Sequence, residues 1–246
     1  MTLSIDNLTE RDIAKAIDHS LLRPELDDAF VEDGCRLAAE YDVASVCVRP
    51  ADVRRAKAIL AGTDVAVGTT IGFPHGNHLT ETKVFEARRA LEDGATELDM
   101  VLQIGALKAG RDADVQADIA AIVDIAHAAG AIVKVIFENY YLTDDEKVRA
   151  CRLSESAGAD FVKTSTGFAA GGATHEDLRL MRRSVSPRVQ VKAAGGVRTL
   201  DALIEVMALG VTRVGATQTK AIIDDFRARR AGAIPSAPAT ADTGAY

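Results

Sequence analysis

Two lysines stand in short apolar segments that lead into glycine-rich stretches. Lys163 lies in residues 160–167 (DFVKTSTG), and Lys192 lies in residues 189–193 (VQVKA). A free lysine amine, with a pKa of about 10.4, is protonated at neutral pH and is a poor nucleophile. Burial and a second nearby cation favour the neutral amine, which can attack a carbonyl carbon. Because adjacent strands lie about 4.8 Å apart, two inward lysines on successive strands can approach closely. The pattern therefore predicts that Lys163 forms a Schiff base, with Lys192 as the second cation. Each lysine taken alone is also compatible with a surface position.

Other ionisable residues occupy further apolar segments. Asp99, in the segment ELDM, is predicted to hold the second lysine and a water for proton transfer, or else to form a structural ion pair. Asp18, Lys134 and Glu138 lie within or at the ends of similar segments. An unpaired buried charge is unfavourable, so we expect these groups to compensate one another. Asp18 is also compatible with a turn after the first strand.

Glycines follow both lysines and recur near the end of the chain. They are accompanied there by a threonine, and the predicted set is Gly167, Gly195, Gly196, Gly215 and Thr217. Glycine lets backbone N–H groups approach an anion closely, and a helix N-terminus favours negative charge. We therefore expect these residues to bind a phosphate group.

Histidine and cysteine residues offer two other kinds of chemistry. His75 and His78, in FPHGNH, suggest a metal-dependent enzyme, but a zinc site needs three or four ligands, and no HExxH motif or cysteine cluster supplies the rest. We expect a loop there, and neither a metal nor a cofactor. Cys35, Cys47 and Cys151 form no CxxC pair, which favours reduced thiols in a cytoplasmic protein.

The elements that must position these residues alternate along the chain. Short β-rich runs are expected to be strands at 16–20, 44–48, 65–71, 97–102, 132–137, 161–164, 189–193 and 212–215. Amphipathic segments are expected to be helices at 28–40, 51–61, 79–93, 114–129, 144–157, 175–183, 200–209 and 218–229. Gly94, Gly130, Gly158 and Gly210 stand where helices should end. Eight such units favour a single-domain (β/α)8 TIM barrel. A doubly wound open sheet is the alternative, although no GxGxxG follows the first strand.

Composition limits the class of protein. The 246 residues are 48% hydrophobic, carry a net charge of −7 and include no tryptophan. The charges are mixed along the chain, so we expect no nucleic-acid partner. The chain has no signal-peptide pattern and no apolar run long enough to span a membrane, so a cytoplasmic location is expected. We expect the barrel to occupy residues 1–230 and a flexible tail to occupy 231–246, which is rich in Ala, Pro, Thr and Gly. A homodimer is the general expectation for assembly.

The segments DFVKTSTG, VKAAGGVRT, ELDM and FPHGN resemble those of the class I deoxyribose-phosphate aldolase family, over about residues 9–226. The resemblance implies a (β/α)8 barrel that reversibly cleaves 2-deoxy-D-ribose 5-phosphate to D-glyceraldehyde 3-phosphate and acetaldehyde. It places the Schiff-base lysine at Lys163, its partner lysine at Lys192 and the catalytic aspartate at Asp99. It implies a small phosphorylated sugar as the partner and no metal, because the protonated imine accepts the electrons.

The chain departs from this family at several positions. Thr217-Gln218 replaces a common serine pair, Gln103 stands where Asn is frequent, and 139–141 (NYY) replaces a Thr-containing stretch. The first change leaves open an imine-forming aldolase that acts on a different aldehyde phosphate or on an unphosphorylated sugar. A non-catalytic phosphate-binding barrel is a third hypothesis, which the presence of both lysines and Asp99 disfavours. The terminal Tyr246 could reach the barrel mouth and assist proton transfer, as the resemblance implies, or have no role.

Overall fold

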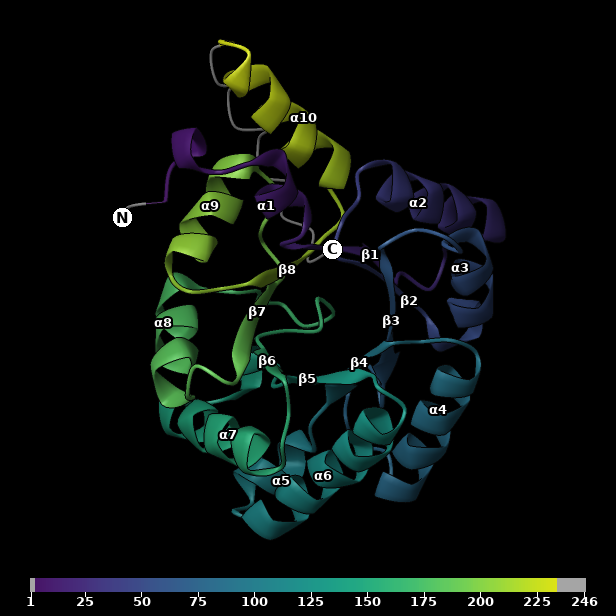
Figure 1. The fold of residues 1–246 in the computed structure, drawn as a ribbon. Coiled ribbons are helices and arrows are strands. Elements are labelled where there is room, and N and C mark those ends of the chain that lie inside the picture. Colours follow the sequence, from purple (N-terminus) through teal and green to yellow (C-terminus); the bar gives the residue numbers. More distant parts are fainter. Residues whose placement is uncertain (1–2, 234–246) are drawn as a thin grey trace.

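Eight parallel strands close into a barrel, with helices around the outside (Figure 1). The computed structural model describes residues 3–233. The strands, in chain order and in order around the ring, are β1 (Ile17–Leu21), β2 (Ser45–Val48), β3 (Ala66–Ile71), β4 (Glu97–Val101), β5 (Ile132–Ile136), β6 (Phe161–Lys163), β7 (Gln190–Ala194) and β8 (Arg213–Ala216). β8 pairs with β1, so the ring has no free edge. The predicted (β/α)8 barrel is confirmed, and the open doubly wound sheet is excluded.

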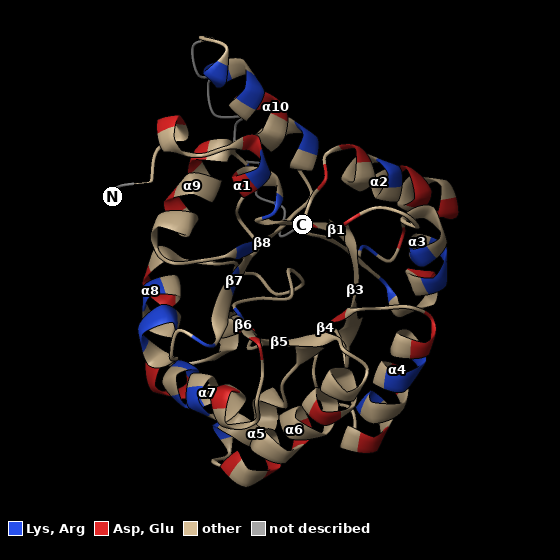
Figure 2. Cartoon of the chain, in the orientation of Figure 1, with Lys and Arg blue, Asp and Glu red and all other residues tan. Residues whose placement is uncertain are grey.

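The helices form an outer layer that covers the strands. They are α1 (Glu10–Ala14), α2 (Asp28–Glu40), α3 (Val53–Ile59), α4 (Thr80–Glu92), α5 (Ile104–Lys108), α6 (Asp112–Ala128), α7 (Asp144–Ser156), α8 (His175–Ser184), α9 (Leu200–Ala208) and α10 (Thr219–Arg230). Three short 3-10 helices, η1 (Ile5–Asn7), η2 (Pro50–Asp52) and η3 (Asn139–Tyr141), complete the described elements. Acidic and basic residues are interspersed along the helices of this outer layer (Figure 2).

Every predicted strand and long helix is present, with ends shifted by only a few residues. The glycines expected after helices adopt positive φ; Gly94 and Gly158, for example, have φ of 107° and 88°. This left-handed conformation ends a helix without the steric clash that a Cβ atom would cause. The prediction missed the short helices α1 and α5, which have five residues each and no long apolar repeat.

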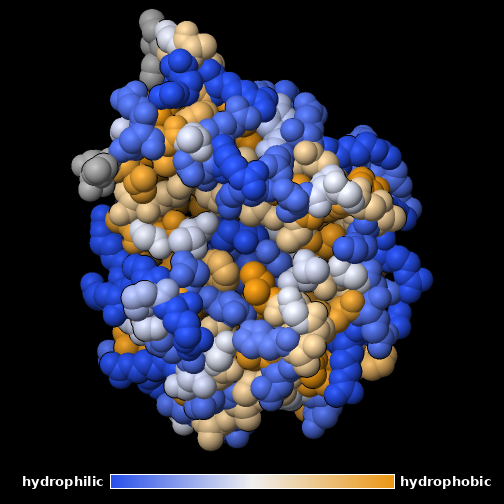
Figure 3. All heavy atoms as spheres, viewed as in Figure 1, coloured by the Kyte–Doolittle hydropathy of each residue, from blue (hydrophilic) through white to orange (hydrophobic). Residues whose placement is uncertain are grey.

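The apolar core lies mainly between the strands and the helices. On β5, Val133 and Val135 are fully buried, and they alternate with Lys134. Since successive side chains of a strand point to opposite faces, the valines pack toward the helices while Lys134 points into the barrel. On the face shown in Figure 3, hydrophilic residues predominate around the rim formed by the helices. The barrel interior is thus available for charged residues, which the alternation along the strands places there.

None of the described helices is long and apolar enough to cross a membrane. The tail predicted over 231–246 falls almost entirely outside the described residues, so its flexibility stays a prediction. Tyr246 also lies outside them.

Candidate active site

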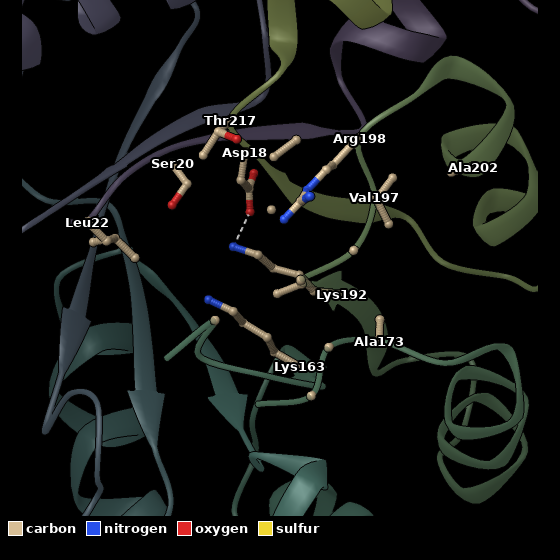
Figure 4. A pocket seen from close by; sticks show the side chains of 18 of the residues that line it. Asp18, Ser20, Leu22, Lys163, Ala173, Lys192, Val197, Arg198, Ala202 and Thr217 are labelled. Atoms are coloured by element: carbon tan, nitrogen blue, oxygen red, sulfur yellow. Dashed lines mark ion pairs between the residues drawn. The ribbon is translucent and has the colours of Figure 1, made fainter. Parts of the chain in front are cut away.

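Lys163 and Lys192 lie side by side inside the barrel. They are register partners on β6 and β7, and both side chains are almost fully buried. The two Nζ atoms donate to the same carboxylate oxygen, Asp99 Oδ2, at 2.7 Å from Lys163 and 2.8 Å from Lys192. The two lysines point in the same direction, toward the cavity (Figure 4). The sequence-predicted trio therefore meets at a single atom.

A second layer of charges lies on the other side of Asp99. Lys134 Nζ donates to Asp99 Oδ1 at 2.8 Å and to Glu97 Oε2 at 2.6 Å. Asp18 Oδ2 lies 2.5 Å from Lys192 Nζ, and its Oδ1 accepts from Arg213 Nε at 2.6 Å. Asp18 is thus an inward side chain of β1 that belongs to the network, not a turn residue after that strand. The predicted members Asp18 and Lys134 both join the central cluster.

The cluster contains four cations and three carboxylates. The cations are Lys134, Lys163, Lys192 and Arg213, and the carboxylates are Asp18, Glu97 and Asp99. Burial alone would raise the pKa of the Asp99 carboxyl, but the charges of the three lysines outweigh that effect and hold the pKa well below its ordinary value. Burial opposes the charge of Lys134, yet its three carboxylate neighbours raise its pKa. Asp99 therefore stays a carboxylate, and Lys134 stays an ammonium.

Arg213, Ser45 and Glu97 were not predicted as site residues. Arg213 Nη2 lies 2.7 Å from Glu97 Oε2, so this arginine bridges two carboxylates from different strands. Ser45 Oγ donates to Asp18 Oδ1 at 2.8 Å. The sequence shows that each of these three residues is a polar residue within a predicted strand. Which of them meet inside the barrel depends on the register between strands, and the sequence does not reveal that register.

A cavity of about 450 Å³ opens from the two lysines toward the loops that follow β6, β7 and β8. The predicted phosphate residues all line it: Gly167, Gly195, Gly196, Gly215 and Thr217. Gly167, Gly195 and Gly196 have positive φ, so their peptide groups take orientations that other residues rarely adopt. The side chain of Arg198, which was not predicted as a site residue, also extends into this cavity (Figure 4).

Glu138 does not join the lysine cluster through an ion pair. Its Oε2 accepts hydrogen bonds from the backbone N–H, at 3.0 Å, and the hydroxyl of Thr166 in the loop after β6. Burial raises the pKa of the Glu138 carboxyl, while the bonds from Thr166 and the charge of Lys163 oppose that rise. Glu138 also has a φ of 54°, a left-handed conformation that costs a non-glycine residue about 1 to 2 kcal/mol.

Four other residues named in the sequence analysis lie outside this cluster. His75 and His78 are exposed in the loop before α4, and no group of three or more potential metal ligands occurs within residues 3–233. Cys47 lines the cavity, where burial raises the pKa of its thiol to about 11. Gln103 turns to the helix layer, where its amide donates to Asp118 Oδ1 at 3.2 Å. The departure at Gln103 therefore leaves the lysine cluster unchanged.

The sequence of this chain matches a known family over most of its length. The family model of the DeoC/LacD family aldolases matches residues 12–223. A deoxyribose-phosphate aldolase of Rhodopirellula baltica is 50% identical over 88% of this chain and 90% of its own. A deoxyribose-phosphate aldolase of Thermococcus gammatolerans is 51% identical, and the match covers 88% of this chain and 97% of that protein.

Solved structures show the same relation. The tetrameric deoxyribose phosphate aldolase of Aeropyrum pernix superposes with a TM-score of 0.84, at 30% identity, over 92% of this chain and 95% of that one. The matched family model spans all eight strands and therefore every residue of the central cluster. The chain belongs to the DeoC/LacD family of aldolases.

Proposed function

We propose that this chain is a Schiff-base aldolase that reversibly cleaves 2-deoxy-D-ribose 5-phosphate to D-glyceraldehyde 3-phosphate and acetaldehyde. The observation that carries the proposal is the convergence of Lys163 and Lys192 on one oxygen of Asp99, at the inner end of a glycine-lined cavity. The names of the two curated relatives support the choice of substrate.

Lys163 is the proposed nucleophile because it is the last residue of β6 and lines the cavity. The cluster has one more cation than carboxylates, so release of one proton from Lys163 leaves three cations facing three carboxylates. The neutral amine then attacks C1 of the open-chain sugar, and loss of water gives the iminium. Asp99 and Lys192 lie close enough to Lys163 to move the protons that these steps require.

The iminium accepts the electrons of the bond that breaks. Lys192, left neutral after it gives a proton to the departing water, takes the proton of the C3 hydroxyl. The C2–C3 bond breaks, and glyceraldehyde 3-phosphate leaves with C3 as its aldehyde carbon. C2 of the remaining enamine then takes a proton, and water releases acetaldehyde and restores Lys163. Lys192, which shares Asp99 Oδ2 with Lys163, is the proposed proton donor and acceptor.

The phosphate is proposed to occupy the far end of the cavity. Thr199 caps the N-terminus of α9 and lines this end, so the helix dipole favours an anion there. The side chain of Arg198 adds positive charge. Thr217, where the family resemblance leads us to expect a serine pair, also lines this end of the cavity and carries one hydroxyl group.

Trapping of the imine tests the nucleophile. Wild-type protein is incubated with acetaldehyde and borohydride, and the modified peptide is mapped by mass spectrometry. The adduct is expected on Lys163 and is expected to be absent from Lys163→Arg, whereas Lys83→Arg, a change at another buried lysine, retains it. An adduct that maps to a different lysine in the wild-type protein contradicts the proposal.

The substrate is tested by comparing deoxyribose 5-phosphate with deoxyribose. The proposed phosphate site predicts a much higher kcat/KM for the phosphorylated sugar. Equal values favour the alternative, an imine-forming aldolase of the same fold for unphosphorylated sugars. If a different aldehyde phosphate reacts faster than deoxyribose 5-phosphate, the result favours an imine-forming aldolase whose substrate is that phosphate.

We also infer that the protein is a cytoplasmic homodimer without a nucleic-acid partner. Light scattering distinguishes this homodimer from a tetramer such as that of the Aeropyrum pernix relative. Deletion of the tail from residue 234 onward tests the proposed role of Tyr246, since a catalytic tyrosine predicts a lower kcat without a change in thermal stability.

A further inference from the structure

Glu138 combines three features that packing alone does not explain. Its side chain is 2% exposed, and its backbone φ of 54° lies in the left-handed region. Its second carboxylate oxygen, Oε1, is buried and has no hydrogen-bond partner among the described residues. Each feature is unfavourable for a glutamate, and such outliers gather where a residue has a functional task.

The left-handed turn at Glu138 directs its side chain along the loop after β6. The backbones on either side are already joined to that strand, since Phe137 N donates to Lys163 O at 3.0 Å and Asn139 N donates to Thr164 O at 2.9 Å. The Glu138 carboxylate then extends this pairing by two more residues, to Thr166. The end of β5 therefore holds the chain immediately beyond Lys163.

Thr166 links Glu138 by hydrogen bonds to Phe168, two residues further along the loop. Its hydroxyl donates to Glu138 Oε2 and in turn accepts from the backbone N–H of Phe168 at 3.0 Å. Gly167, enclosed in this turn with a φ of 90°, lines the cavity. The direction of the Thr166 hydroxyl, and with it the orientation of the Gly167 peptide, depends on the carboxylate.

The ring of Phe168 closes the outer side of the same turn. It meets the ring of Phe73, from the loop after β3, edge to face with centroids 5.2 Å apart. Glu138 itself is absent from the cavity lining, so it acts through the turn and does not touch a ligand in the cavity.

We propose that Glu138 is a positioning residue that holds the Thr166–Gly167–Phe168 turn so that Gly167 can bind the phosphate group of the substrate. This inference rests on the proposed function, because it assumes a phosphate at the glycine-lined end of the cavity. It assigns Glu138 to substrate binding and not to the proton transfers at Lys163.

The test is the separation of KM from kcat in Glu138→Ala and Glu138→Gln. Glu138→Ala is expected to raise KM for deoxyribose 5-phosphate about tenfold, the effect of losing one hydrogen bond to a charged group, with kcat changed less than about threefold. Glu138→Gln keeps an acceptor oxygen for Thr166, so most of the wild-type KM should return. Cleavage of plain deoxyribose should be nearly unchanged in both variants. Glu81→Ala, at an exposed glutamate of α4, is the control and should match the wild type.

Two outcomes overturn the inference: an unchanged KM in Glu138→Ala, or an equal loss with both sugars. If Glu138→Ala does not fold, Thr166→Val and Thr166→Ser replace it, because only serine keeps the hydroxyl group. The selective rise in KM should then appear in the valine variant alone, and equal KM values in the two variants contradict the inference. Failure of the proposed function is recognised separately, since wild-type protein would then cleave no deoxyribose 5-phosphate.

Discussion

Both carboxylate oxygens of Asp99 accept hydrogen bonds from lysines, and these bonds determine how the lysines are arranged. Oδ2 accepts from Lys163 and Lys192, while Oδ1 accepts from Lys134. An asparagine at this position keeps the shape but has one acceptor oxygen and no charge. Three ammonium groups would then face an amide, and the lysine pair would lose the group that holds it together.

Asp99→Asn is expected to lower kcat/KM by about 10²- to 10⁴-fold, the usual range for a group that takes part in proton transfer. Asp118→Asn is the matched control, because Asp118 is a buried aspartate that pairs with Lys83 at 2.6 Å within the helix layer. Removal of one partner of a buried ion pair costs about 3 to 5 kcal/mol of stability, so the control should unfold more easily. Its activity per folded molecule should nevertheless stay within about threefold of wild type.

Steady-state kinetics and urea unfolding of both variants separate the two effects. A catalytic role for Asp99 is contradicted if the two variants lose activity only in proportion to their unfolded fraction.

At the scale of elements, the loops after β6 and β7 pack backbone against backbone. A Cβ atom added at Gly172 would lie 2.6 Å from the carbonyl oxygen of Gly195, whose neighbour Gly196 also lines the cavity. The carbonyl oxygen of Gly195 belongs to the backbone, so it cannot move aside as the end of a long side chain can. The close contact therefore requires glycine at 172.

Gly172→Ala is expected to push the two loops apart and to raise KM for the phosphorylated substrate, with little effect on imine formation with acetaldehyde. Gly105→Ala is the control. It lies in α5 with no atom within 4 Å of the added Cβ, and alanine should stabilise this helix by about 0.5 to 1 kcal/mol. Steady-state assays measure KM for the phosphorylated substrate in both variants. An unchanged KM in Gly172→Ala would show that the loop contact does not shape the proposed phosphate site.

The closure between β8 and β1 contains a pH-sensitive contact. His19 on β1 is buried, its Nδ1 lies 2.9 Å from Thr219 Oγ1 at the start of α10, and burial lowers its pKa from 6.5 to about 4. Between these two values the unfolded chain binds a proton that the folded chain excludes. The stability that this neutral histidine contributes is therefore full above pH 6.5 and is lost as the pH falls toward 4.

The loss should reach about 2 kcal/mol at pH 5 relative to pH 7. His19→Asn does not titrate in this range, so its urea-unfolding free energy should fall less between the two pH values. Parallel curves for wild type and variant would exclude His19 as the source of the pH dependence.

The sequence predicts the barrel well because the period of apolar residues and the glycines at helix ends are local signals. It also indicates Lys163, Lys192 and Asp99, since charged residues are rare in apolar strands. It does not reveal that Arg213 bridges Asp18 and Glu97, because this contact joins residues at least 116 positions apart through the register of a closed ring. The hydrogen bonds from Thr166 to Glu138 depend on the left-handed backbone of Glu138, which no repeat in the sequence indicates.

The whole molecule holds a cluster of charges where most barrels of this kind have an apolar interior. Four cations face three carboxylates, so one positive charge is in excess, whereas the Lys83–Asp118 pair in the helix layer is balanced. Asp99 keeps two lysine partners if Lys163 is removed. Catalysis and stability should therefore have opposite requirements at Lys163.

Lys163→Met is expected to abolish aldol cleavage while leaving the stability equal to wild type or higher by about 1 to 4 kcal/mol. Lys83→Met leaves Asp118 without its buried partner and should lower stability by about 3 to 5 kcal/mol. Thermal unfolding of the two variants compares these changes. Equal destabilisation would contradict the argument from excess charge.

The contact between Lys163 and Asp99 has a consequence for the resting enzyme. A protonated amine and a protonated imine carry the same charge at the same nitrogen, and Asp99 Oδ2 lies 2.7 Å from that nitrogen before any sugar arrives. The unliganded barrel thus already places a carboxylate beside the nitrogen that carries the positive charge of the proposed iminium, with a proton on that nitrogen in place of the bond to the sugar carbon. In the proposed mechanism, the dipoles and charges around Lys163 need not reorganise for the imine to form, and such preorganisation is a major source of rate acceleration in enzymes.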